Sequence, residues 1–189
     1  MIGRISLILH THQLVCFLLL VAPVTLDKET ANMTKVLGLC TGALALVLAT
    51  HASAQTITLR TTMNGGEETP IVSTGMVGTA EVSVDIANRE IVVSLSVFNT
   101  PTATSAGHIH VGPAGISGPV IVNFPRGLAG RSGDFAMSFR LSERDFVPRP
   151  AQGINTIDDA IQAIVNGNSY VNIHTTQHPG GEIRGQLKR

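Results

Sequence analysis

The chain has 189 residues and a formal net charge of zero at pH 7, with 13 basic and 13 acidic side chains. A neutral chain has no electrostatic attraction for nucleic acid or for anionic membrane surfaces, so neither is an expected partner. Aromatic residues are few, and glycine is frequent. Frequent glycine is typical of a protein with many turns. The length suffices for one domain after a targeting segment.

A signal peptide is predicted over residues 33–54. Lys35 precedes an apolar stretch from Val36 to Leu48, and Ala52-Ser53-Ala54 matches the small-residue pattern of a signal-peptidase site. The apolar stretch is too short for a good spanning helix, so the mature chain is expected to have no membrane span. The predicted location is therefore secreted or periplasmic.

Residues 1–32 are interpreted as a mis-called start or an N-terminal extension. A complete signal peptide that begins at Met33 favours translation from that internal methionine, and the alternative is a genuine N-terminal anchor helix. Both cysteines, Cys16 and Cys40, precede the predicted cleavage site. The mature domain, residues 55–189, must therefore be held together by its core without disulfides.

Alternating apolar and polar residues predict β-strands through most of the mature domain. Asn88 lies at the turn of an expected antiparallel hairpin, and Gly and Pro punctuate the other connections. The expected strands before the C-terminal region are 56–63, 73–86, 90–98, 108–111, 120–124 and 135–141. Several short strands separated by such turns favour an all-β sandwich or a small barrel.

The periodicity changes once, after residue 154. Apolar residues then recur at helical spacing, which predicts an amphipathic helix; they are Ile157, Ala160, Ile161, Ile164 and Val165. Asn155 or Thr156 is the expected N-cap, and Gly167 suits the left-handed position after the helix. This one short helix leads directly into the last predicted hairpin.

That hairpin, Tyr170 to Leu187, carries an alternating polar face. Val171 and Ile173 are expected to face the core, and residues 178–181 have turn chemistry. On the opposite face the pattern predicts a supporting polar network, made by Tyr170, Asn172, Glu182, Arg184 and Gln186.

The histidines of the mature domain are candidate metal ligands. His108 and His110 are two residues apart on an expected strand, so both imidazoles project from one face. If that strand neighbours the strand of His174 with matching core faces, three imidazoles converge. Three imidazoles on a rigid sheet suit Cu²⁺ or Zn²⁺, provided that their nitrogens lie within roughly 4 Å of one another. His178 could fill a fourth position.

A structural interpretation competes with metal binding. Histidines on a polar face can hydrogen-bond to Glu182, to Asn172 or to the backbone without ever holding a metal. Glu182 and Arg184, considered in isolation, are expected to form a surface ion pair of little energetic weight. Convergence of the three histidine nitrogens is therefore the observation that separates the two interpretations.

Two segments strongly resemble the CHRD domain, a module first described in chordin and found singly in many exported bacterial proteins. One begins HIHVGPAG at His108, and the other runs from YVNIHT at Tyr170 to GEIRGQL at Leu187. The family's opening motif is similar to the segment that contains Glu68 and Pro70. The resemblance implies an immunoglobulin-like β-sandwich distantly similar to copper/zinc superoxide dismutases, whose H-x-H copper ligands His108 and His110 would match.

Three functions are consistent with these observations. The first is a non-enzymatic binding module that holds copper or zinc through the strand histidines. The alternatives are a metal-dependent oxidoreductase resembling the dismutases, and a structural or partner-binding module of the cell envelope whose partner is an unidentified protein or envelope component. The absence of a nucleophile elbow, a Walker loop and a Rossmann fingerprint weighs against an enzyme.

Overall fold

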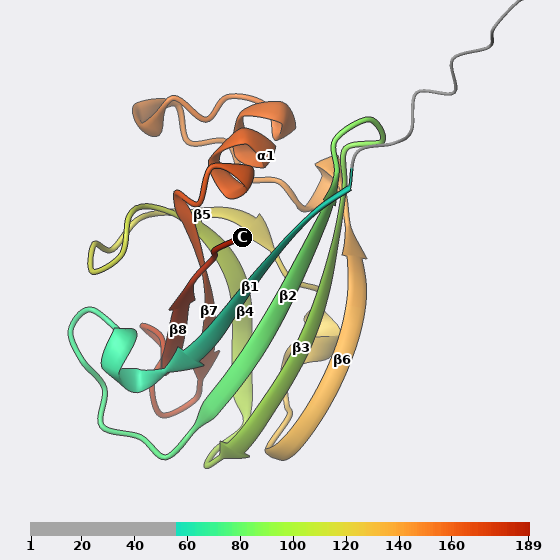
Figure 1. The fold of residues 1–189 in the computed structure, drawn as a ribbon. Helices are drawn as coiled ribbons and strands as arrows, with labels where there is room; N and C mark the ends of the chain where they lie inside the picture. Colours follow the sequence, from blue (N-terminus) through green and yellow to red (C-terminus); the bar gives the residue numbers. More distant parts are fainter. Residues whose placement is uncertain (1–55) are drawn as a thin grey trace, which may run out of the picture. The chain divides into compact units, whose positions relative to one another are not determined.

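A computed structural model describes residues 56–189, which form one antiparallel sheet of eight strands, four 3-10 turns and one α-helix (Figure 1). The predicted signal peptide and the segment before it, residues 1–54, lie outside the described residues. The strands are ordered β5-β4-β7-β8-β1-β2-β3-β6 across the sheet. The all-β architecture predicted from the alternating pattern is confirmed.

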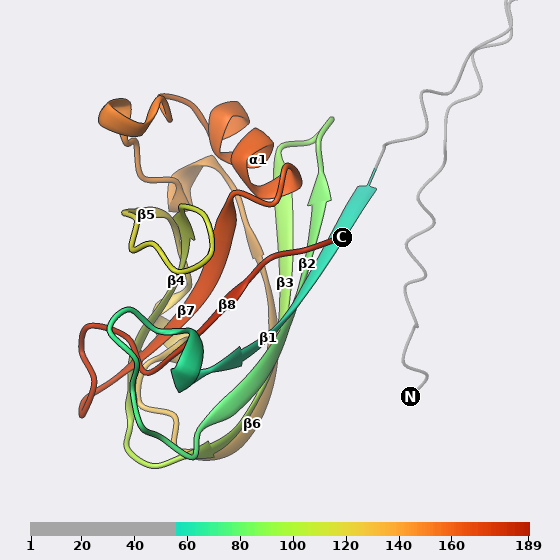
Figure 2. The same cartoon turned by 60° about the vertical axis from the view of Figure 1, so that its left-hand side comes forward.

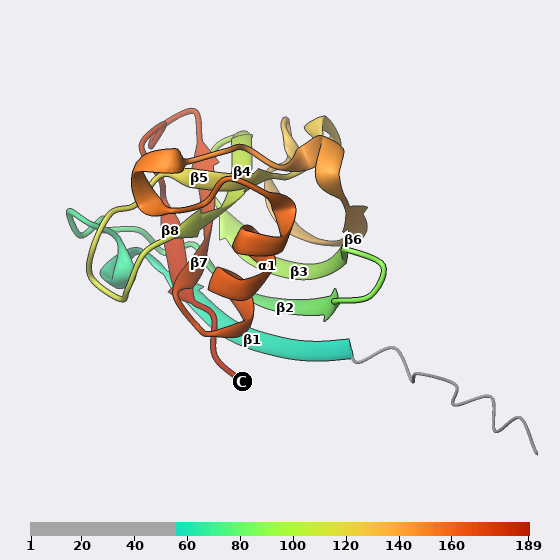
Figure 3. The ribbon, with the colours of Figure 1, turned by 90° about the horizontal axis from the view of Figure 1, so that it is seen from above.

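The sheet curls so that its two halves face each other as the layers of a sandwich (Figures 1 and 3). One half contains β1 (Thr56–Asn64), β2 (Val77–Asp85), β3 (Glu90–Thr100) and β6 (Gly133–Leu141). The other half contains β4 (Thr104–Val111), β5 (Val120–Asn123), β7 (Ser169–Thr175) and β8 (Ile183–Gln186). The two layers expected of a sandwich are thus parts of one continuous sheet.

The halves join along a narrow seam between β1 and β8 (Figure 2). Asn64 pairs with Arg184, and Arg60 and Lys188 exchange two backbone hydrogen bonds of 2.7 and 3.0 Å. A Cβ on Gly185 would overlap the backbone carbonyl of Thr62. A glycine there lets the two strands approach closely enough to continue the sheet.

The core lies between the two layers and follows from the period-two pattern of the strands. In β2 and β3 alternate side chains are fully buried, among them Val82, Val84, Ile91 and Val93. Ile109 and Ile173 supply the facing layer. Helix α1 (Ile157–Val165) closes one end with its five apolar residues (Figure 3). Its N-cap is Thr156, one of the two predicted candidates, and Asp159 completes a capping box.

Two strands begin four residues away from their predicted starts, and the other boundaries agree within two residues. β4 begins at Thr104, four residues before the expected start, because Thr104 pairs with Thr175 and Gly107 packs beneath Phe124. β2 begins at Val77, and the residues before it belong to a loop that starts at η1 (Gly65–Glu67). The other short turns are η2 (Arg126–Leu128), η3 (Glu143–Asp145) and η4 (Pro150–Gln152). No helix within residues 56–189 is long and apolar enough to cross a membrane.

Candidate functional site

The outer face of β4, β7 and β8 brings together most of the predicted polar residues. β4 pairs with β7 and β7 pairs with β8, so side chains align in rows across three strands. The rows are His110–Tyr170–Gln186 and His108–Asn172–Arg184, and His174 lies beside them opposite Ala106. Neighbouring strands with matching core faces were the condition for convergence of the histidines, and the structure meets it.

The three strand histidines form a compact cluster. The Nδ1 atom of His108 lies 3.0 Å from the Nε2 atom of His174. One potential ligand nitrogen from each of His108, His110 and His174 lies within 4.8 Å of the others. The ring centroids of His108 and His174 are 4.8 Å apart, and those of His108 and His110 are 5.5 Å apart.

Backbone carbonyl groups fix the tautomers of two of these histidines. Nδ1 of His110 lies 2.8 Å from the carbonyl oxygen of Gly118, and Nδ1 of His174 lies 2.9 Å from that of Pro179. Because a carbonyl oxygen can only accept, both Nδ1 atoms must carry the proton. The lone pair of each ring therefore lies on Nε2. The buried Nε2 of His110 has no hydrogen-bond partner within residues 56–189.

Burial keeps the cluster in its uncharged form. Desolvation, followed by the charges of His174 and His110, lowers the pKa of His108 from the usual 6.5 to about 4. Desolvation also lowers the pKa of His110 to about 4, against the opposing effect of its bond to Gly118. The pKa of His174 is lowered by burial, against its bond to Pro179. All three imidazoles are therefore neutral at pH 7, the state in which histidine binds a metal.

A stack of three side chains supports His110. The ring of Tyr170 lies parallel to that of His110, with centroids 4.8 Å apart and planes 12° apart. The guanidinium carbon of Arg184 lies 3.5 Å from the Tyr170 centroid, so a cation covers the other face of the phenol. Arg184 is 2% exposed. The stack holds the imidazole of His110 in one orientation.

A loop over residues 112–119 covers the stack. Nη2 of Arg184 donates to the carbonyl oxygens of Pro113 and Ile116, at 3.1 and 2.9 Å. The Tyr170 hydroxyl donates to the Gly118 carbonyl and accepts from the Gly118 amide. The same Gly118 carbonyl accepts from His110. Arg184 and Tyr170 thus position the backbone group that sets the tautomer of a candidate ligand.

Two amide side chains secure the loops around the site. Nε2 of Gln186 donates to the carbonyl oxygens of Gly112 and Gly167, at 3.1 and 2.8 Å. Nδ2 of Asn172 donates to the carboxylate of Glu68, which comes from the loop after η1. Burial raises the pKa of Glu68, and its bond to Asn172 and the charge of Arg184 oppose that rise. The sequence places Glu68 in the segment that resembles the family's opening motif, but it does not predict that Glu68 lies beside Asn172.

The expectation that Glu182 and Arg184 form an exposed ion pair is wrong. Glu182 precedes β8, is fully buried, and accepts hydrogen bonds from Thr74 and Thr175. The carboxylate of Glu182 is therefore bonded to two hydroxyl groups and, within residues 56–189, to none of the three strand histidines. Arg184 is buried in its own bonds to the loop, and the two side chains do not form the exposed ion pair predicted from their spacing.

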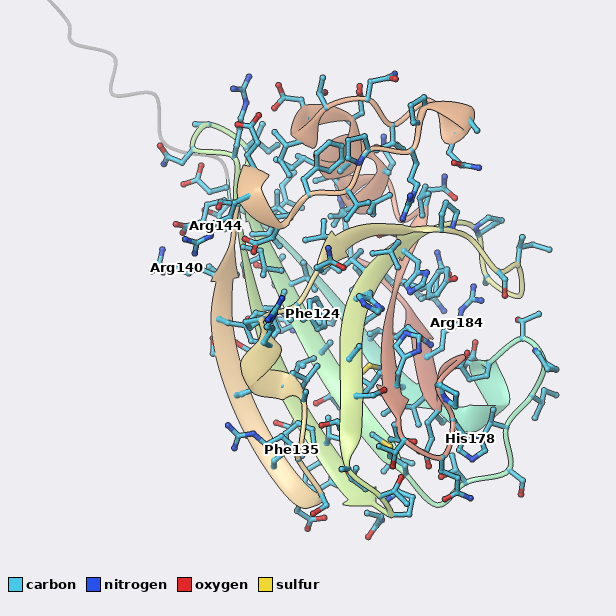
Figure 4. The ribbon with its side chains drawn as sticks, turned by 180° about the vertical axis from the view of Figure 1, so that it is seen from behind. Phe124, Phe135, Arg140, Arg144, His178 and Arg184 are labelled. Atoms are coloured by element: carbon cyan, nitrogen blue, oxygen red, sulfur yellow. The ribbon has the colours of Figure 1, made fainter. Side chains whose placement is uncertain are left out.

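His178 lies apart from the cluster in the β7–β8 connection. Its amide donates to the hydroxyl of Thr175, and its side chain is not among the three that converge. Figure 4 views this outer face, with Arg184 partway along the hairpin and His178 near its turn. The structure therefore assembles three of the four candidate ligands.

The family model for the CHRD domain matches residues 59–187, which includes every residue of this site. The chain belongs to the CHRD domain family. No curated protein and no solved structure matches it in the corresponding comparisons. In this CHRD domain the two segments that carry the resemblance, around His108 and from Tyr170 to Leu187, are the strands and loop that build the histidine cluster.

Proposed function

We propose that this CHRD domain is a binding module that holds one Cu²⁺ or Zn²⁺ ion. The ligands would be Nδ1 of His108, Nε2 of His110 and Nε2 of His174. The observation that carries the proposal is the pairing of neutral imidazoles with backbone carbonyl groups that fix their tautomers. An imidazole whose far nitrogen donates to a carbonyl is the usual arrangement of a metal-bound histidine.

The distances within the cluster require only a small adjustment. Metal–nitrogen bonds of about 2.0–2.1 Å at tetrahedral angles place ligand nitrogens roughly 3.4 Å apart. Nδ1 of His108 and Nε2 of His174 are 3.0 Å apart, and one potential ligand nitrogen from each of the three histidines lies within 4.8 Å of the others. A separation of 4.8 Å exceeds the roughly 4 Å expected from the sequence, so side-chain rotation must bring the most distant pair closer by up to about 1.4 Å to reach the tetrahedral separation.

Metal binding would replace the contact between His108 and His174. Because Nε2 of His174 carries the lone pair, Nδ1 of His108 is the donor in that contact. To become a ligand, His108 must carry its proton on Nε2 instead. The ion would then satisfy the orphaned Nε2 of His110 as well.

Three protein nitrogens leave one position of a four-coordinate ion open. Water or a side chain of a partner could occupy it, so the ion could either stabilise the domain or take part in recognition. Export to a secreted or periplasmic location is part of the proposal and rests on the predicted signal peptide over residues 33–54. No catalytic role is assigned to the site.

Calorimetric titration of the metal-stripped purified protein with Cu²⁺ and Zn²⁺ tests the proposal. We expect one ion per chain. Removing a hydrogen-bond partner of a metal ligand typically lowers metal affinity by roughly 10- to 100-fold. The His108→Ala/His110→Ala variant removes two ligands themselves, so its metal affinity should fall by more than this. His178→Ala is the matched control, because it removes an imidazole outside the cluster. Equal affinities for the double variant and the unmodified protein would end the metal proposal.

A further inference from the structure

The sheet has two outer edges, and within residues 56–189 only one of them is covered. Along β5, Val122 forms a bridge with Phe146, and the amide of Val147 donates to the carbonyl of Ile121 at 2.9 Å. Nε of Arg149 donates to the carbonyl of Val120 at 2.7 Å. The segment after β6 therefore satisfies the backbone groups along β5 and blocks that edge.

The other edge, β6, has no such cover. Its residues pair with β3 on one side, and no backbone hydrogen bond joins 133–141 to any other part of residues 56–189. The strand is nine residues long and contains neither proline nor lysine, two residues that commonly protect an edge. In Figure 4 β6 forms one side of the sandwich, with Phe135 and Arg140 marked along it.

The side chains of β6 alternate between two faces. Phe135, Met137 and Phe139 are half-buried against the rim of the core, where Phe139 contacts Phe124 at 4.9 Å between ring centroids. Asp134 and Arg140 are on the opposite, exposed face, near the two ends of the strand. The edge therefore combines unpaired backbone groups, an incompletely covered apolar row and two opposite charges.

We propose that β6 pairs with β6 of a second copy of this chain. An antiparallel pairing centred on Met137 places Met137 opposite itself, and Phe135 opposite Phe139 of the second copy. The same register places Asp134 opposite Arg140 of the second copy, twice by symmetry. Cross-strand apolar pairs and opposite charges both stabilise adjacent antiparallel strands, so the edge is complementary to itself in one register.

The side chains of Asp134 and Arg140 can both form an additional hydrogen bond to a second copy of the chain. One carboxylate oxygen of Asp134 accepts from the amide of Asn99, which leaves the other oxygen free of any bond within the described part of the chain. Arg140 pairs with Glu90, but its side chain is 72% exposed and has further donors. A single strand pair buries less than the roughly 1,200 Å² of a standard interface, so the dimer is weak and reversible.

Sedimentation velocity of the purified protein from about 1 μM to about 1 mM tests the pairing. The unmodified protein should shift from monomer to dimer over this range. Asp134→Arg and Arg140→Asp should each place like charges opposite one another twice, and should raise the dimer dissociation constant by about 30-fold or more. The combined Asp134→Arg/Arg140→Asp variant restores opposite charges and should dimerise again.

Arg60→Asp is the matched control, because it also breaks an exposed arginine–glutamate pair but lies on β1, away from the edge. It should dimerise like the unmodified protein. Circular dichroism verifies that each variant is folded, and hydrogen exchange of 133–141 provides a second readout that needs no substitution. Exchange in this strand should slow as concentration rises. A monomer at all concentrations, or a charge swap that fails to restore the dimer, would overturn the proposal.

Discussion

The histidines depend on groups that are distant in the sequence. The tautomer of His110 is set by Gly118 and that of His174 by Pro179, so each lone pair is directed by a loop carbonyl. The shared strand face of His108 and His110 was predictable, because alternation is a local property of a strand. The carbonyl partners were not, because they depend on where two loops cross the sheet.

The lowered histidine pKa values predict how stability depends on pH. In the unfolded chain His108 and His110 titrate near their usual 6.5, whereas in the folded protein they titrate at about 4. Between these values the unfolded state binds more protons, so the free energy of unfolding rises with pH. The contribution is complete above 6.5 and is lost as pH falls toward 4.

Urea unfolding at several pH values from about 7.5 to about 4 measures the free energy of unfolding across this range. The His110→Gln variant lacks one of the two titrating groups and should lose less stability over the same interval. The carboxylates are the same in both proteins, so the difference between the two losses of stability reports on the histidines. Identical losses in the two proteins would contradict the assignment of a lowered pKa to His110.

At the scale of elements, two loops convert an outer sheet face into a buried polar layer. The loop over 112–119 is bonded to Arg184 and Gln186, and the loop after η1 inserts Glu68 beside Asn172. The sequence indicated turns in both segments, because glycine and proline determine local bends. It did not indicate that the turns fold back over the sheet. Gly118 is required for this approach, since a Cβ there would overlap the carbonyl of Val111.

Arg184 anchors the first of these loops through its hydrogen bonds to two loop carbonyl groups. Arg184→Met should lower the free energy of unfolding by about 2–4 kcal/mol. The Ile116 carbonyl would lose its donor, the Pro113 carbonyl would keep only the Ile116 amide, and Glu68 would lose a neighbouring cation. Arg184→Lys keeps the charge but loses the planar contact with Tyr170, so it should recover only part of that loss. Both variants should also weaken metal binding, because the Gly118 carbonyl loses its anchor.

Denaturant unfolding and calorimetry measure the two effects. Arg126→Met is the control, since Arg126 is exposed in η2 on a different loop. Its stability and its metal affinity should match those of the unmodified protein. Arg184→Met with unchanged metal affinity would show that the loop does not position the site.

At the scale of the whole molecule, local patterns determined most of the architecture. Short-range spacing of apolar and polar residues predicts the strands, the β2–β3 hairpin, the helix and its Thr156 cap. The order of strands in the sheet and the seam between β1 and β8 do not, because they depend on pairings between residues such as Asn64 and Arg184, which are far apart in the chain. The same limit explains why the hydrogen-bond partners of Glu182 were not predicted, since Thr74 is 108 residues away in the chain.

β4 and β7 place three histidines on one face of the sheet, where we propose that they share one metal ion. The most direct test is a crystal structure of the protein loaded with Zn²⁺, with anomalous scattering measured at the zinc edge. We expect one peak bonded to Nδ1 of His108, Nε2 of His110 and Nε2 of His174 at about 2.0–2.1 Å. Zinc bound only elsewhere, with the contact between His108 and His174 intact, would contradict it.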